Sequence, residues 1–231
     1  MELGSRRVVG AEALLRWVRP DGRSIRPDLF IPIAEESNLM GAVTRFVLAQ
    51  VRADFVELSR GRADFHVAIN ISPQDLLDAS LVEEMCALRE LGPGAVVIEI
   101  TERGMLDRDA ARAAIARLRQ CGLEVAVDDF GTGYSSLSYL ESYEVDHLKI
   151  DKSFVDTLGV EAATSNVASH IIDMARTLRL RLIAEGVERE EQADYLTSRG
   201  VEHAQGWLFG RPEPLAEWSR RTPVDEPASS S

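Results

Sequence analysis

Cysteine is scarce in this 231-residue chain, and long apolar runs are absent from it. The two cysteines, Cys86 and Cys121, have no spacing that predicts a pair, so we expect free thiols in a reducing compartment. No stretch approaches the roughly 20 consecutive apolar residues that a membrane-spanning helix needs. Residues 1–10 also lack the apolar core of a signal peptide. The sequence therefore predicts a cytoplasmic protein with no membrane segment in this chain.

Basic residues are outnumbered by acidic ones. The chain has 26 Lys and Arg against 38 Asp and Glu, which gives a formal net charge of −12. A field of this sign repels nucleic acid polymers and anionic membranes, so we expect neither as a partner. A small anionic ligand remains compatible if metal ions or a few basic residues reverse the local sign. The hydrophobic content of 45% supports a sizeable core, and the length fits one α/β domain.

Short apolar runs alternate with helical segments of ten or more residues. This alternation predicts βα units and a parallel sheet. Residues 222–231 are rich in Pro, Ala and Ser, which predicts a disordered tail after a domain that spans residues 1–221. We expect seven strands, near residues 8–15, 65–71, 96–101, 124–128, 146–150, 181–184 and 202–205.

Acidic side chains stand where several of these apolar runs end. A closed (β/α) barrel carries its reactive groups at the carboxyl ends of its strands, whereas an open doubly wound sheet uses only two or three strands. The distribution therefore favours a barrel. Converging carboxylates repel one another unless cations lie between them, which predicts divalent metal ions and phosphate chemistry. The five acidic residues are Glu12, Glu99, Asp128, Asp129 and Glu185.

Most of these motifs have a plainer interpretation when each is taken alone. Glu12 could form a surface salt bridge with Arg16, because positions 12, 14 and 16 would share one face of a strand. Asn70 could cap the helix that begins at Pro73, although Ser72 could do so equally well. Lys149, in an apolar strand, could be a lysine at a barrel rim whose ammonium reaches water.

The run from Asp128 to Gly133, with the sequence DDFGTG, is the strongest local signal. Adjacent aspartates at the end of a strand cannot both ionise comfortably without cations. Gly131 and Gly133 would let the following loop approach a ligand closely. A solvated turn is the alternative, since Asp and Gly are common in turns, but the apolar run before Asp128 makes that alternative weaker.

Seven blocks in order resemble the EAL domain of bacterial cyclic di-GMP phosphodiesterases. The resemblance runs from about Val9 to Pro212 and implies a modified (β/α)8, TIM-like barrel with one antiparallel strand. The blocks are Glu12-Ala13-Leu14, the strand end at Asn70, Glu99-Ile100-Thr101-Glu102, Asp128-Asp129-Phe130-Gly131-Thr132-Gly133, Lys149-Ile150-Asp151, Ala184-Glu185-Gly186-Val187-Glu188 and Gln205-Gly206.

The resemblance also implies a role for each of these positions. Two ions, Mg²⁺ or Mn²⁺, would activate the water that opens one phosphodiester of cyclic di-GMP and yields linear 5′-pGpG. Glu102 would brace the loop from Phe130 to Ser136, and a homodimer is expected through residues 130–140. The first ion would be held by Glu12, Asn70, Glu99 and Asp128, and the second by Asp128, Asp129 and Glu185. The residues that would act in catalysis are Glu185, Lys149 and Asp129. Those that would bind substrate are Arg16, Leu14, Gln205 and Glu188.

One feature of the family is missing from the sequence. Family members carry a first strand, joined by a hairpin to the strand of Glu12, and this chain begins after it. We hypothesise that the barrel lacks that strand, which would leave an edge beside residues 8–15 exposed and prone to association. A cyclic di-GMP receptor that no longer hydrolyses is then the alternative to an enzyme. A pure scaffold is disfavoured because it gains nothing from buried acids, and upstream sensor or GGDEF domains are expected partners.

Overall fold

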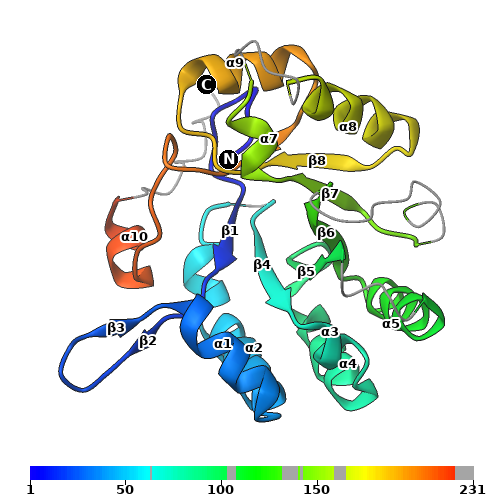
Figure 1. The fold of residues 1–231 in the computed structure, drawn as a ribbon. Helices are drawn as coiled ribbons and strands as arrows, with labels where there is room; N and C mark the ends of the chain where they lie inside the picture. Colours follow the sequence, from blue (N-terminus) through cyan, green and yellow to red (C-terminus); the bar gives the residue numbers. More distant parts are fainter. Residues whose placement is uncertain (63, 103–107, 132–139, 141–142, 159–164, 222–231) are drawn as a thin grey trace, which may run out of the picture.

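The fold is described from a computed structural model. It covers residues 1–62, 64–102, 108–131, 140, 143–158 and 165–221 (Figure 1). Most of the loop after Phe130 and the tail at 222–231 lie outside these described residues. Their predictions are therefore untested.

A curved parallel sheet forms the centre of the molecule, with helices along its outer side (Figure 1). All seven predicted strands are present, and each pairs in parallel with its neighbours in the order β1-β4-β5-β6-β7-β8-β9. The strands are β1 (Gly10–Ala13), β4 (His66–Ile71), β5 (Val96–Thr101), β6 (Glu124–Phe130), β7 (His147–Ile150), β8 (Arg181–Ala184) and β9 (His203–Ala204).

The first strand is shorter than expected. β1 ends at Ala13, so Leu14 and Arg16 lie beyond it, and the prediction that positions 12, 14 and 16 share one strand face was wrong. A small antiparallel hairpin follows instead, formed by β2 (Trp17–Val18) and β3 (Ser24–Ile25). Its turn contains Gly22 at φ 82°, a conformation that glycine adopts without strain. This hairpin carries the chain away from the barrel after β1.

The helices follow the strands as the alternation predicted, with short additional helices. Ser72 accepts a hydrogen bond from the Asp75 amide and so caps the helix at Pro73, which leaves Asn70 for other contacts. The helices are α1 (Pro27–Glu36), α2 (Met40–Leu58), α3 (Pro73–Leu76), α4 (Ala79–Cys86), the 3₁₀ helix η1 (Ala87–Leu91), α5 (Arg108–Gln120), α7 (Lys152–Val155), α8 (Ser165–Thr177), α9 (Glu190–Ser198) and α10 (Leu215–Arg221). None of the helices in the described ranges is long and apolar enough to cross a bilayer.

The two end strands of the sheet, β1 and β9, are not paired with each other. Residues near the N-terminus lie along the outer edge of β9, where Glu2 forms an antiparallel bridge with His203. The Leu3 amide donates to the Glu202 carbonyl at 2.9 Å, and the Leu3 side chain is buried. A cavity of about 1110 Å³ is lined by β1, by β9 and by parts of α2 and α10. The barrel therefore stays open between its end strands.

Inward-facing side chains form three layers along the strands, because residues two apart share one face. Acidic and amide side chains lie at the carboxyl ends. Ala68, Val97 and Ala126 form a small buried cluster below them, separate from the main core under the helices. The lowest layer, two residues earlier on each strand, contains the polar residues His66 and Glu124. A thin apolar layer thus separates two polar ends of the barrel interior.

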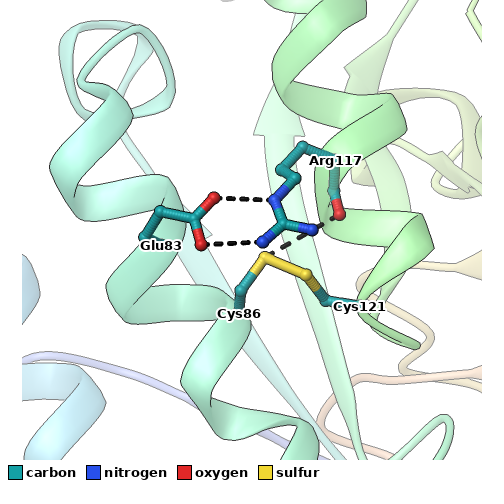
Figure 2. Close-up of a disulfide and its surroundings, with 4 residues drawn as sticks. All are labelled: Glu83, Cys86, Arg117 and Cys121. Atoms are coloured by element: carbon teal, nitrogen blue, oxygen red, sulfur yellow. Dashed lines mark hydrogen bonds and ion pairs between the residues drawn. A yellow bond between two sulfur atoms is a disulfide. The ribbon is translucent and has the colours of Figure 1, made fainter.

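Cys86 and Cys121 are joined by a disulfide in this structure (Figure 2). The expectation of free thiols was wrong. Cys86 ends α4 and Cys121 follows α5, and the packing of these two helices brings the Cα atoms to 5.4 Å. That distance lies within the usual range for a bridge. Beside the disulfide, Arg117 donates two hydrogen bonds to Glu83, at 2.6 and 2.8 Å (Figure 2). The disulfide could not be inferred from the spacing of the cysteines in the sequence, and the ion pair could not be inferred from the sequence either.

Candidate functional site

Lys149 lies at the centre of the acidic layer. It stands in the middle of β7 and has no exposed surface. Its Nζ is 2.8 Å from Glu99 Oε2, 2.8 Å from Glu185 Oε1 and 3.1 Å from Asp128 Oδ2. Glu12 Oε2 lies at 4.0 Å. Four predicted acids from β1, β5, β6 and the end of β8 therefore converge on one ammonium group, and the rim-lysine interpretation is wrong.

Two amide side chains complete this layer. Asn70 donates from Nδ2 to Glu12 Oε1 at 2.6 Å. Gln205 donates from Nε2 to Glu12 Oε2 at 2.8 Å and to Glu185 Oε1 at 2.7 Å. Glu12 is thus bound within the barrel, and a salt bridge to Arg16 is not found in the described part of the chain. These amides link β4 and the segment after β9 to the acids of β1 and β8.

The backbone after β9 holds Gln205 in position. The Gln205 amide donates to the Ala184 carbonyl at 2.8 Å, and the Val187 amide donates to the Gln205 carbonyl at 3.0 Å. Gly206 has a φ of 153°, and a Cβ atom there would lie 2.2 Å from the Val187 carbonyl oxygen. A side chain at 206 would therefore force these two segments apart and move the Gln205 amide away from the acids.

Asp128 and Asp129 are consecutive, yet both contribute to one group of carboxylates. In a regular strand they would point to opposite faces. The pairing of β6 with β7 shifts register between Val127 and Phe130, and Asp129 has a φ of 54°. A bulge of this kind redirects a side chain. As a result, one carboxylate oxygen from each of Asp128, Asp129 and Glu185 lies within 4.8 Å of the other two. Such a set of hard oxygen ligands suits Mg²⁺ or Mn²⁺.

Burial and mutual repulsion change the acidity of this cluster. Desolvation raises the pKa of Glu99 to about 8, against the opposing effect of Lys149, and Glu12 and Asp128 raise it further. Desolvation likewise raises the pKa of Glu185 to about 7. The burial of Lys149 lowers its pKa, but the surrounding carboxylates more than offset this, so its pKa stays well above its ordinary value. Without divalent ions, the cluster thus retains protons near neutral pH.

The remaining predicted residues lie further out. Leu14 and Arg16 line the cavity beside β1, and the exposed Arg16 side chain donates to the Leu15 carbonyl at 2.9 Å. Glu188 is exposed and pairs with Lys152 at 2.9 Å, away from the Lys149 cluster. Glu102 is described, but most of the loop that it was predicted to brace is not, so that role is untested. The structure therefore does not bring Arg16 or Glu188 to the acidic layer.

Lys152 was missed by the sequence analysis. Its Nζ binds Glu188 and Asp156, both at 2.9 Å, and Lys152 lines the same cavity as Glu12, Glu99 and Glu185. A Cβ atom added to Gly186, whose φ is 65°, would lie 2.3 Å from the Lys152 side chain. Gly186 therefore lets Lys152 lie beside the segment that carries Glu185. The only sequence signal was its position one residue after the Lys149-Ile150-Asp151 block.

Comparison with known proteins agrees with this geometry. A family model described as EAL domain matches residues 1–212. The chain is 40% identical to the probable cyclic di-GMP phosphodiesterase PdeB of Escherichia coli K12, over 95% of this chain and 42% of PdeB. It thus spans less than half the length of that relative.

Two solved structures share the fold. A complex titled as the PaMucR phosphodiesterase with c-di-GMP has a TM-score of 0.84 and 38% identity, over 91% of this chain and 87% of that chain. The EAL enzyme Bd1971, in a form bound to cAMP and cyclic di-GMP, has a TM-score of 0.90 and 32% identity, over 96% and 62% of the two chains. With a family match that covers residues 1–212, the chain belongs to the EAL domain family.

Proposed function

We propose that this domain is a metal-dependent phosphodiesterase that hydrolyses cyclic di-GMP to linear 5′-pGpG. The observation that carries the proposal is the convergence of carboxylates from separate strands, with those of Asp128, Asp129 and Glu185 at mutual distances suited to a shared ion. The names of the relatives support the choice of substrate.

The charge of the cluster supports two divalent ions. The cluster contains five carboxylates, four of them within 4.0 Å of the buried Lys149 ammonium group, which leaves a formal charge of −4 when all are ionised. Two divalent cations would offset that charge and displace the protons that Glu99 and Glu185 retain. We propose Glu12, Asn70, Glu99 and Asp128 for one ion and Asp128, Asp129 and Glu185 for the other. Magnesium and manganese both suit these oxygen ligands.

The residues of the chain have separate tasks in this proposal. Bound Mg²⁺ or Mn²⁺ would lower the pKa of a coordinated water and act as a Lewis acid toward the phosphate oxygens. Lys149, fixed between Glu99 and Glu185, would orient the attacking water by donating a hydrogen bond. Gln205, fixed by Glu12, would hold the dinucleotide, and Arg16 would swing from the Leu15 carbonyl to the phosphate. Leu14 and Glu188 remain proposed substrate contacts.

Other expectations remain proposals as well. A homodimer through residues 130–140 falls largely outside the described residues. Association with a GGDEF domain is supported by the name of the Pseudomonas aeruginosa relative MucR, a bifunctional diguanylate cyclase and cyclic di-GMP phosphodiesterase. A cytoplasmic location also remains a proposal. The expected free thiols no longer support it, because the two cysteines are bonded in this structure.

A turnover assay tests the function. The protein is incubated with cyclic di-GMP and Mn²⁺, and pGpG is measured by chromatography. We expect product from the parent protein and at least a hundredfold loss in Glu12→Ala and in Glu185→Ala. Glu57→Ala, an exposed acid on α2, is the matched control and should keep full activity. Binding without product would support the receptor alternative, and neither binding nor product would contradict both.

A further inference from the structure

The lower end of the barrel interior gathers histidines. The chain has four histidines, and three of them begin strands of the sheet: His66 in β4, His147 in β7 and His203 in β9. Each lies two residues before a residue of the upper layers. For example, His147 precedes Lys149 by two residues, and His203 precedes Gln205 by two. All three therefore face the barrel interior, opposite the acidic cluster.

His147 has the hydrogen bonding of a metal-binding imidazole. It is almost fully buried, and its Nε2 is 2.7 Å from Glu124 Oε2. Arg181 binds the other oxygen of Glu124 at 2.7 Å and helps to keep this acid ionised. A carboxylate only accepts, so Nε2 carries the hydrogen, and in the neutral ring the lone pair lies on Nδ1. That Nδ1 is buried and has no hydrogen-bond partner within the described ranges. A carboxylate on the far nitrogen is the usual support of a metal-bound histidine.

The other two rings offer further nitrogen ligands. His66 and His203 lie with their ring centroids 6.2 Å apart, and the Nδ1 of His203 is also buried without a partner among the residues described. Desolvation, together with the charges of His203 and His147, lowers the pKa of His66 to about 4. The His66 ring is therefore neutral at physiological pH, which is the form that binds metal.

We propose that the lower end of the barrel binds one transition-metal ion of the zinc type through His66, His147 and His203, with Glu124 orienting His147. Imidazole suits Zn²⁺, whereas the oxygen ligands of the acidic cluster suit Mg²⁺ and Mn²⁺. Ala68, Val97 and Ala126 separate the two sites. The barrel would thus hold two kinds of metal ion at its two ends.

The His66 and His203 rings must turn toward His147, which Glu124 holds, for the three to share one ion. Within the described residues, only the group of Asp128, Asp129 and Glu185 already has its ligand atoms within 4.8 Å of one another. His66 and His203 both line the large cavity, so they have room to rotate and an ion can reach them. Gly10 leaves space for the His66 ring, because a Cβ atom at position 10 would lie 2.5 Å from His66 Nε2.

Zinc titration in excess Mg²⁺ tests the proposal, because under the proposed function Mg²⁺ would occupy the acidic cluster. Imidazole ¹⁵N resonances are followed in the parent protein. We expect one equivalent of Zn²⁺ to shift the signals of His66, His147 and His203 and to leave His170, which is exposed on α8, unchanged. Unchanged signals for the three histidines, or equal shifts for all four, would overturn the proposal.

Variants provide an independent check by equilibrium dialysis. His147→Gln and His203→Gln should each weaken Zn²⁺ binding by at least tenfold, and His170→Gln should leave it unchanged. Glu124→Gln, which keeps an acceptor but removes the charge, should weaken binding by about 10- to 100-fold. Circular dichroism checks that each variant folds. Full retention of the zinc equivalent in a folded His147→Gln, His203→Gln double variant would refute the site.

Discussion

Lys149 is the residue that holds the acidic cluster together when divalent ions are absent. Its ammonium group has no exposed surface and lies within 3.1 Å of three carboxylates from three different segments. Burying a lysine is unfavourable unless it is paired, and burying several carboxylates without a cation is worse. The stability of the barrel therefore depends on this one side chain, and the proposed divalent ions would supply the same charge compensation.

We predict that Lys149→Met lowers the free energy of unfolding of metal-free protein by about 3–5 kcal/mol, the usual effect of removing one partner of a buried ion pair. Urea unfolding in EDTA measures this. Lys152→Met is the matched control, because Lys152 is the only other lysine and its ion pairs are exposed. It should cost less than about 1 kcal/mol. Added Mn²⁺ should restore much of the loss in Lys149→Met, and equal effects of the two variants would contradict the argument.

His66 should make the protein sensitive to acid. Burial and the neighbouring histidines lower its pKa from 6.5 to about 4, so between these values the unfolded chain binds more protons than the folded one. Stability should therefore fall as pH decreases from 6.5 to 4, by about 3 kcal/mol from this group. Glu99 and Glu185 act in the opposite direction, because their pKa values are raised.

The difference between the parent protein and His66→Gln isolates this contribution. Urea unfolding in metal-free buffer at several pH values should show a stability gap that changes by about 3 kcal/mol between pH 6.5 and 4. His170→Gln, on the exposed face of α8, should run parallel to the parent protein. A constant gap for His66→Gln would mean that His66 keeps an ordinary pKa in the folded state.

The acidic cluster could be predicted residue by residue, and the lower layer could not. Glu99, Asp128 and Glu185 lie within or directly after apolar runs, and a carboxylate in that position is conspicuous. His66 instead precedes such a run and His203 is followed by a single alanine, and in both positions a polar residue is indistinguishable from a loop residue. Arg16 was misplaced for a different reason: the strand ends at Ala13, and nothing in the sequence marks that boundary.

At the level of elements, α4 and α5 form a connected pair outside β5. The disulfide joins their C-terminal ends, and the ion pair of Arg117 with Glu83 lies beside it (Figure 2). The segment between the two cysteines includes all of β5 and therefore Glu99. Reduction of the bond would free a loop that contains a residue of the acidic cluster.

We predict that reduction lowers the free energy of unfolding by roughly 4 kcal/mol, from the chain-entropy model applied to a separation of 35 residues. Thermal and urea unfolding with and without a dithiol reductant measure the effect. The Cys86→Ser, Cys121→Ser double variant should match the reduced parent protein and should not respond to reductant. Two free thiols in the denatured, unreduced protein would show that the bond is absent.

The order of the elements was predictable because each strand is a short apolar run and each helix a longer amphipathic segment. The hairpin of β2 and β3 was not, because strands of two residues show no alternation. The disulfide was missed because it depends on how α4 packs against α5, a tertiary contact over 35 residues. The local sequence pattern thus predicted the strands and helices, whereas the contacts between them could be identified only from the three-dimensional structure.

At the scale of the whole molecule, the sheet does not close on itself within the described residues. There β1 pairs with β4 alone, and residues near the N-terminus bridge β9 without joining it to β1. An open edge beside a large cavity invites pairing with another strand. The hypothesis that a further strand pairs beside residues 8–15 stays a prediction, which the mass and thermal stability of a version extended upstream would test.

Divalent ions should stabilise the whole barrel because they replace protons and repulsion in the acidic cluster. A ligand at 100 times its dissociation constant adds about 2.7 kcal/mol to the stability of the folded state. The gain should depend on pH. Below pH 7 Glu185 and Glu99 hold protons that an ion must displace, since their pKa values are about 7 and 8. We therefore predict that the increase in Tm with Mn²⁺ grows from pH 6 to pH 8.5.

Differential scanning fluorimetry at fixed Mn²⁺ concentration measures this increase across the pH range. Asp129→Asn keeps the shape of the side chain but removes one carboxylate of the group with Asp128 and Glu185, so its Tm increase should be much smaller. Glu57→Ala should behave as the parent protein. An increase in Tm that is the same at pH 6 and pH 8.5 would mean that the ions do not displace protons from Glu99 and Glu185. The negative charge of the acidic cluster would then have to be neutralised by something other than the two proposed cations.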